Sequence, residues 1–135
     1  MRRVVIDTNV LVSHLLGGKP RQVVSLWYVG LIELCLSDDI LAEYARVLDR
    51  FDQVENEARE LLGLLTEGSN VRMVKPKERF RAVAADPSDN IFLECAVAAQ
   101  ADAIISGDAH LLDLGRFRGI PIMSPGAFLD SVMGD

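Results

Sequence analysis

The stretch DPSDNIFLECAVAAQADAIISGD, residues 86–108, decides the fold. Its first five residues are typical of a turn followed by a helix start. Residues 91–100 are apolar on nearly every side, which predicts a deeply packed helix. Residues 103–106 then form a short apolar run, typical of a buried strand, that ends at Gly107 and Asp108. A buried helix followed by a buried strand, with acids at both junctions, indicates an α/β protein.

The same alternation extends in both directions from this stretch. Short apolar runs predict strands, and segments with helical spacing, opened by Pro20, Ser37 or Pro125, predict helices. Strands alternating with helices form right-handed crossovers, so we expect a four- or five-stranded, mostly parallel sheet with helices on both faces. The expected strands are 4–6, 31–36, 71–74, 103–106 and 121–123, and the expected helices are roughly 10–16, 21–29, 38–51, 54–66, 91–100, 109–114 and 126–133.

The composition fits one domain over residues 1–135 with a large aliphatic core. Half of the residues are hydrophobic and only 6% are aromatic, which suits helices packed on a parallel sheet. The formal net charge of -6 argues against broad, non-specific coating of nucleic acid. It does not exclude a nucleic-acid enzyme, because metal ions neutralise clustered carboxylates.

Cysteine usage and the N-terminus bound the cellular setting. Cys35 and Cys95 each lie in an apolar run, which favours two buried, reduced thiols over a disulfide or a metal site. The apolar run before Asp7 is too short for a signal peptide or a membrane span. We therefore expect a cytoplasmic protein without a membrane anchor.

Acidic residues from four segments are expected at one edge of the sheet. In an open parallel sheet, the carboxyl ends of the strands and the N-termini of the crossover helices share an edge, where sites form. Like charges gathered there are costly unless a cation binds. Oxygen ligands suit Mg²⁺ or Mn²⁺, and two such ions ~4 Å apart promote phosphodiester cleavage. The acids that the chain places there are Asp7, Asp38, Asp39, Glu43, Asp86, Asp89 and Asp108.

Each acid also has an ordinary structural explanation, and these alternatives stay open. Asp38 and Asp39 are explained by the helix start alone and are left out of the site. Glu43 can pair with Arg46 three residues on. The other acids can satisfy a turn or cap a helix: Asp7, Asp86, Asp89 and Asp108.

Four motifs, in order along the chain, resemble the PIN domain family. They are IDTNVLVS at 6–13, EYARVL at 43–48, the stretch at 86–108, and HLL at 110–112. The resemblance runs from Val4 to about Met123 and is closest to bacterial and archaeal toxin components of toxin–antitoxin pairs. It implies a three-layer α/β/α fold and a ribonuclease that depends on Mg²⁺ or Mn²⁺. The family's catalytic and metal-binding acids fall on Asp7, Glu43, Asp89 and Asp108.

The resemblance also implies accessory residues and partners. Asp86 and Asn90 take accessory positions, and Asn9 and Ser106 take small polar positions that orient ligands or attacking water. Related toxins commonly form homodimers and are inhibited by a small antitoxin. The substrate implied is RNA, cut by metal-activated water without a covalent intermediate.

One basic cluster is a candidate for gripping RNA phosphates, although such a run is more often a solvated face. It consists of Arg72, Lys75, Lys77, Arg79 and Arg81. Two alternative functions remain open. A catalytically silent PIN-like module would bind RNA or protein. A phospho-acceptor receiver domain is also a small α/β fold, but it needs a late lysine at a strand end, where this chain has Ile122 and Ser124.

Overall fold

The computed structural model describes residues 2–17, 21–83 and 87–133. Its centre is a sheet in the order β3-β2-β1-β4-β6-β5, in which all pairs are parallel except that of β5 with β6. The mixed α/β class and the mostly parallel sheet are confirmed. The strands are β1 (Arg2–Ile6), β2 (Ile32–Leu36), β3 (Val71–Met73), β4 (Ala103–Ile105), β5 (Arg116–Phe117) and β6 (Ile120–Met123).

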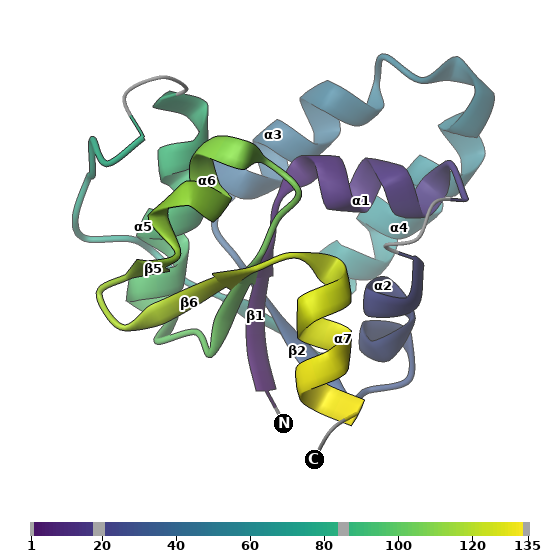
Figure 1. Ribbon diagram of the computed structural model, residues 1–135. Coiled ribbons are helices and arrows are strands. Elements are labelled where there is room, and N and C mark those ends of the chain that lie inside the picture. The colour runs from purple at the N-terminus through teal and green to yellow at the C-terminus, as the bar shows by residue number, and fades with distance from the viewer. Residues whose placement is uncertain (1, 18–20, 84–86, 134–135) are drawn as a thin grey trace.

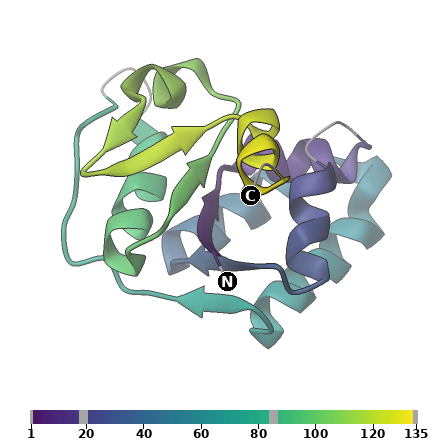
Figure 2. The same ribbon diagram turned by 60° about the horizontal axis from the view of Figure 1, so that its bottom comes forward.

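Helices cover both faces of the sheet (Figure 1). Helix α5 packs on β1, β2 and β4, whereas α2 contacts β2 and α7, and α7 contacts β6. Figure 2 shows α5 on one side of the sheet and α2 with α7 on the other. The helices are α1 (Thr8–Leu15), α2 (Arg21–Tyr28), α3 (Asp38–Leu48), α4 (Glu55–Glu67), α5 (Asn90–Ala99), α6 (Ala109–Leu114) and α7 (Pro125–Met133), with 3₁₀ turns η1 (Asp52–Val54) and η2 (Pro87–Asp89).

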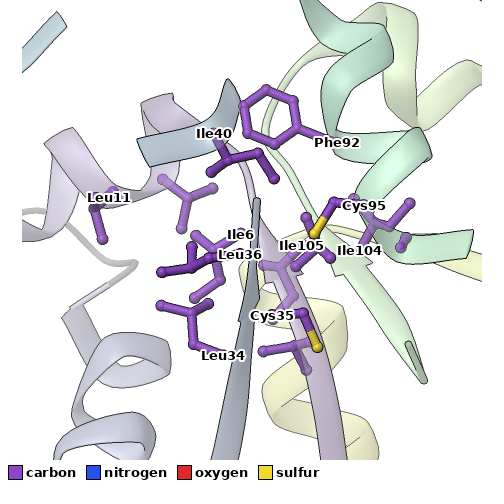
Figure 3. Close-up of a cluster of buried hydrophobic side chains, with 14 of the residues drawn as sticks. Ile6, Leu11, Leu34, Cys35, Leu36, Ile40, Phe92, Cys95, Ile104 and Ile105 are labelled. Atoms are coloured by element: carbon purple, nitrogen blue, oxygen red, sulfur yellow. The ribbon is translucent and has the colours of Figure 1, made fainter. Parts of the chain in front are cut away.

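The core is built from the continuous apolar runs of the central strands. Val4, Val5 and Ile6 of β1 and Ile104 and Ile105 of β4 have no exposed surface, as expected for parallel strands covered on both faces. Figure 3 shows side chains from β1, β2, β4, α3 and α5 meeting in one cluster. The buried apolar runs therefore define the end of each central strand, and these ends form the edge of the sheet at which the acidic residues lie.

The two cysteines belong to this core. Cys35 and Cys95 are both buried free thiols, and both lie in the cluster of Figure 3. The prediction of buried, reduced thiols agrees with this placement. Among the described residues, no helix is long and apolar enough to cross a membrane.

Side-chain caps start three helices at the carboxyl edge of the sheet. The Ser37 hydroxyl accepts a hydrogen bond from the Ile40 amide at 3.2 Å and begins α3. Asp7 caps α1 and Asp108 caps α6 with their carboxylates. These caps satisfy amides that would otherwise lack partners at the helix ends. Figure 1 shows α1, α3 and α6 together at the end of the sheet where β1 stops.

The short antiparallel strand β5 is the element that the sequence analysis did not predict. It is joined to β6 by Arg118 and Gly119, whose φ angles are 49° and 82°. Two consecutive positive φ angles are typical of the tight hairpin turn that matches strand twist. A two-residue strand is too short to show a periodic pattern, so the sequence predicted the five parallel strands but not β5.

Candidate active site

One pocket brings together all four acids that the resemblance singled out. It has a volume of about 200 Å³ and lies at the carboxyl edge of the sheet. The acids reach it from the end of β1, from α3, from the start of α5 and from the loop after β4. Its lining residues are Asp7, Thr8, Asn9, Glu43, Arg46, Val47, Arg50, Ser88, Asp89, Phe92 and Asp108.

Asp7 is the most enclosed of these acids, with 3% of its surface exposed. Its carboxylate accepts a hydrogen bond from the Val10 amide at 2.9 Å and another from the Ser106 hydroxyl. Burial raises the pKa of the Asp7 carboxyl above its ordinary value, and the charge of Asp108 adds to this, whereas the hydrogen bonds from Ser106 and Val10 act in the opposite direction. Desolvation is therefore the largest influence on the pKa of Asp7, and a bound cation would offset the cost of burying the ionised carboxylate.

Ser106 links two of the acids. Its hydroxyl donates to Asp7 and accepts a hydrogen bond from the Asp108 amide at 2.9 Å. The Asp108 side chain in turn accepts from the amides of His110 and Leu111 and begins α6. Ser106 therefore orients the Asp7 carboxylate and the backbone of Asp108. Asp108 also caps α6, which is the structural role that the sequence analysis left open for it.

Glu43 reaches the pocket from α3 and forms an ion pair with Arg46. The pairing that the sequence analysis left open is thus present in this structure. The neighbouring Tyr44 is fully buried, and its hydroxyl donates to the Ile6 carbonyl. Burial raises the pKa of Tyr44 well above its ordinary value, and the charge of Asp7 adds to this. Tyr44 therefore anchors α3 to the end of β1 as a neutral donor.

Asp89 ends η2 and is 8% exposed. It occupies the position before α5, but its side chain makes no capping hydrogen bond. The capping explanation that was open for Asp89 is therefore not the one that this structure supports. Asp89 therefore lies in the pocket without capping a helix, whereas Asp7 and Asp108 both line the pocket and cap a helix.

The predicted accessory residues separate into different places. Asn9 is exposed and lines the pocket. Asn90 is outside its lining and is buried, with its side-chain oxygen accepting from the Val83 amide at 2.9 Å. Asn90 thus tethers the segment before α5. Asp86 lies outside the described residues.

The donor chemistry of the pocket suits a hard divalent cation. Four carboxylates offer only oxygen ligands, as Mg²⁺ and Mn²⁺ prefer. In the same pocket the Thr8 hydroxyl is buried without a hydrogen-bond partner among the described residues. Within residues 2–17, 21–83 and 87–133, however, no three acidic, histidine or cysteine side chains stand close enough together to hold an ion as placed. Coordination of one ion by three or more of these carboxylates would therefore require them to move closer.

The predicted basic cluster does not form one continuous surface of free charges. Arg72 pairs with Glu33 at 2.7 Å, and Arg79 pairs with Asp39 at 2.6 Å and with Glu94 at 2.8 Å. Lys75, Lys77 and Arg81 are exposed. Of the five, only Arg79 lines a groove next to the acidic pocket.

Sequence reasoning did not assign two basic residues to the pocket itself. Arg46 lies on α3 three residues after Glu43, Arg50 lies in the turn just after α3 ends, and both line the pocket with Glu43. A spacing of three residues places Glu43 and Arg46 on one face of the helix, whereas the position of Arg50 depends on where the helix ends. The sequence indicated Arg46 only as a partner of Glu43, and Arg50 lies outside the predicted basic cluster.

Glu94 is the second feature that the sequence did not reveal. It lies in the apolar helix α5 and is buried, and its carboxylate accepts a hydrogen bond from the Phe80 amide at 3.0 Å while pairing with Arg79. Both partners come from the segment before α5, too far along the chain for a local pattern to show them.

Comparison with known proteins agrees with the fold and with the placement of the motifs. None of the curated proteins compared matches this chain. A family model described as PIN domain matches residues 3–110, from β1 into α6. Members of this family are generally nucleases and typically bind divalent metal ions, and the match leaves the receiver-domain alternative without support. Because the matched region covers most of the chain and includes every described acid of the pocket, the protein belongs to the PIN domain family.

Proposed function

We propose that this protein is a metal-dependent endoribonuclease, formed by residues 1–135 as one domain. The observation that carries the proposal is the convergence of Asp7, Glu43, Asp89 and Asp108, from four segments, on one pocket in a PIN domain. Such a gathering of like charges costs free energy, which a divalent cation would offset. Mg²⁺ or Mn²⁺ is the ion whose ligand preference fits four carboxylates.

The pocket residues divide the work of hydrolysis. When bound, Mg²⁺ or Mn²⁺ neutralises phosphodiester charge and makes a water molecule a better nucleophile at neutral pH. Asp7 is held in place for the ion by Val10 and Ser106, and Glu43, Asp89 and Asp108 complete the ligand set. Asn9, exposed at the rim of the pocket, is placed to hydrogen bond substrate or attacking water.

The biological role that we propose is the toxin of a toxin–antitoxin pair. The support is the order of four motifs, IDTNVLVS, EYARVL, DPSDNIFLECAVAAQADAIISGD and HLL, which resembles such toxins. A homodimer inhibited by a small antitoxin is the corresponding assembly. Two buried free thiols suit a reducing compartment, so the proposed location is the cytoplasm.

A catalytically silent PIN module that binds RNA or a protein is the second candidate. One observation favours it: Glu43 already has a cationic partner in Arg46. This ion pair neutralises one of the four carboxylates without a metal ion, as a pocket without metal chemistry would require.

The decisive experiment measures hydrolysis of a fluorescent single-stranded RNA in Mn²⁺ and in chelator. We compare wild type with Asp89→Asn and with the matched control Asp113→Asn, an exposed aspartate of α6 outside the pocket lining. Wild type and the control are expected to cleave only with Mn²⁺, and Asp89→Asn to lose most of the activity. Cleavage in chelator, or full activity of Asp89→Asn, would overturn the assignment, and RNA binding without cleavage would select the silent module.

Thermal melting of the same proteins tests the metal directly. At Mn²⁺ about a hundredfold above its dissociation constant, binding adds ~2.7 kcal/mol to the free energy of unfolding. Wild type and Asp113→Asn should gain this stability, whereas Asp89→Asn should gain much less. Equal Mn²⁺ responses in all three proteins would make Asp89 a structural residue.

A further inference from the structure

Two arginines, one on α3 and one just after it, line the same pocket as the four acids. Arg46 lies on α3 and Arg50 lies in the turn that follows it, and both line the pocket together with Glu43. Arg46 also lines an adjoining groove to which Arg79 contributes. We call Arg46 and Arg50 the pocket arginine pair. The acidic pocket therefore has a basic rim that continues into the next groove.

The two arginines differ in their partners. Arg46 is ion-paired with Glu43, and its side chain is 55% exposed. The guanidinium of Arg50 is exposed and forms no ion pair or hydrogen bond within the part of the chain that the structure describes. An exposed ion pair between helix neighbours contributes little to stability and opens easily. Neither arginine is therefore needed to hold the fold together.

We propose that the pocket arginine pair binds phosphate groups of the RNA strand, and that Arg46 is held on Glu43 until a divalent cation takes its place there. This inference rests on the proposed function. Guanidinium groups bind phosphate through two parallel hydrogen bonds, which suits Arg46 and Arg50 to a phosphodiester. Arg50 is available at all times, whereas Arg46 becomes available when Glu43 turns to the cation.

The arrangement couples the binding of the cation to the binding of RNA. Without a cation, four carboxylates repel the RNA backbone, and Arg46 is occupied by one of them. A cation on Glu43 lowers that repulsion and releases Arg46 at the same time, so RNA affinity rises through both effects. Cation and RNA thus bind with positive coupling, which by linkage is reciprocal.

The first test measures RNA binding rather than cleavage. Fluorescence anisotropy of a short labelled single-stranded RNA follows the affinity over a range of salt concentrations, in chelator and in Ca²⁺, with electrophoresis verifying that the RNA is intact. The variants are Arg46→Gln and Arg50→Gln. The matched control is Arg59→Gln, because Arg59 forms an exposed helix ion pair with Glu55 but lines a different pocket.

Each lost phosphate contact should lower the slope of log affinity against log salt by ~0.7 on a single strand. Arg50→Gln is expected to lower it in both conditions, and Arg46→Gln only in Ca²⁺. Arg59→Gln should match wild type throughout. If all three variants show the wild-type slope in Ca²⁺, the inference is wrong.

A double-mutant cycle separates release of Arg46 from simple charge removal. In chelator, Glu43→Gln should strengthen RNA binding in the wild-type background and much less in the Arg46→Gln background. An equal gain in both backgrounds would mean that Arg46 is not restrained by Glu43. If wild type neither binds nor cleaves RNA, the proposed function itself fails. If it does both while the arginine variants behave like Arg59→Gln, only the inference fails.

Discussion

Asp7 and Glu94 are two buried carboxyls that the chain surrounds with different partners. Glu94 pairs with the Arg79 guanidinium at 2.8 Å and accepts a hydrogen bond from the Phe80 amide at 3.0 Å. Asp7 receives hydrogen bonds from the neutral donors of Val10 and Ser106 and has no ion pair with any described residue. Burial raises the pKa of Asp7.

The difference distinguishes a structural carboxyl from a candidate ligand. A buried charge is stable when it is both hydrogen-bonded and paired. The chain supplies both for Glu94 and thereby fastens the segment before α5. For Asp7 it supplies hydrogen bonds alone. The ionised carboxylate therefore needs a positive charge from outside the described chain, and without one the carboxyl holds its proton more tightly.

The largest expected effect is on catalysis. Asp7→Asn should lower Mn²⁺-dependent RNA cleavage by about a hundredfold or more, since metal-based charge stabilisation is worth several kcal/mol and each 1.36 kcal/mol is tenfold in rate. The same chemical change at the other carboxyl, Glu94→Gln, should have a far smaller effect. Initial rates under saturating Mn²⁺ give the comparison. Equal losses in the two variants would remove the distinction.

The second effect is on stability and has the opposite ranking. Glu94→Ala leaves the Phe80 amide without its acceptor, which should lower the free energy of unfolding by about 1–3 kcal/mol. Asp7→Asn keeps an oxygen to cap α1, so in chelator at neutral pH it should be as stable as wild type or more stable. Urea denaturation of both variants measures this. A larger loss for Asp7→Asn would show that its charge stabilises the fold.

A third, smaller effect concerns pH. Because the folded pKa of Asp7 is raised, the folded protein binds its proton more tightly than the unfolded chain. The resulting stability is complete below the unfolded pKa and is lost as pH rises through the folded pKa. The stability of Asp7→Asn relative to wild type should therefore increase with pH across that window, by about 1.4 kcal/mol for each unit of pKa difference. Urea midpoints in chelator, measured on both sides of the window, provide the test, and a constant difference would contradict it.

The smallest response is expected from the two buried cysteines, whose thiols stay protonated. Burial raises the pKa of Cys35 to about 11 and that of Cys95 to about 12. With an ordinary thiol pKa near 8.5, the thiolate fraction at neutral pH falls by about a hundredfold or more. Labelling of the native protein with a thiol reagent should therefore be far slower than labelling in urea. Rapid native labelling would show that the core around them opens.

Much of the acidic site could be predicted because it follows from topology. Because residues 4–6 and 103–106 are predicted to be buried parallel strands, Asp7 and Asp108 are expected at one edge of the sheet. Helical geometry then placed Glu43 near them. Glu43 and Arg46 are neighbours on one helix, so the sequence predicted their pairing as an alternative. The sequence alone does not show whether Glu43 pairs with Arg46 or binds a metal ion.

The rest depended on contacts between distant segments. Glu94 meets Arg79 across 15 positions, and no periodic pattern marks which polar residue of an apolar helix will find a partner. Asn90 shows the same difficulty, because the resemblance put it near the site while its side chain holds Val83. Side-chain direction at a helix start is set by tertiary packing, which the sequence alone did not fix.

The two ends of the sheet also bear on how the protein behaves at high concentration. An edge strand presents unpaired amides and carbonyls that can recruit another chain, and proteins limit this by keeping such strands short. Here the edges are β3, with three residues, and β5, with two. The β5–β6 turn is held by Arg118, which stacks on Phe80 at 4.5 Å and pairs with Glu78. Loosening that turn would bare the edge of β6 and open a route to aggregation through strand addition.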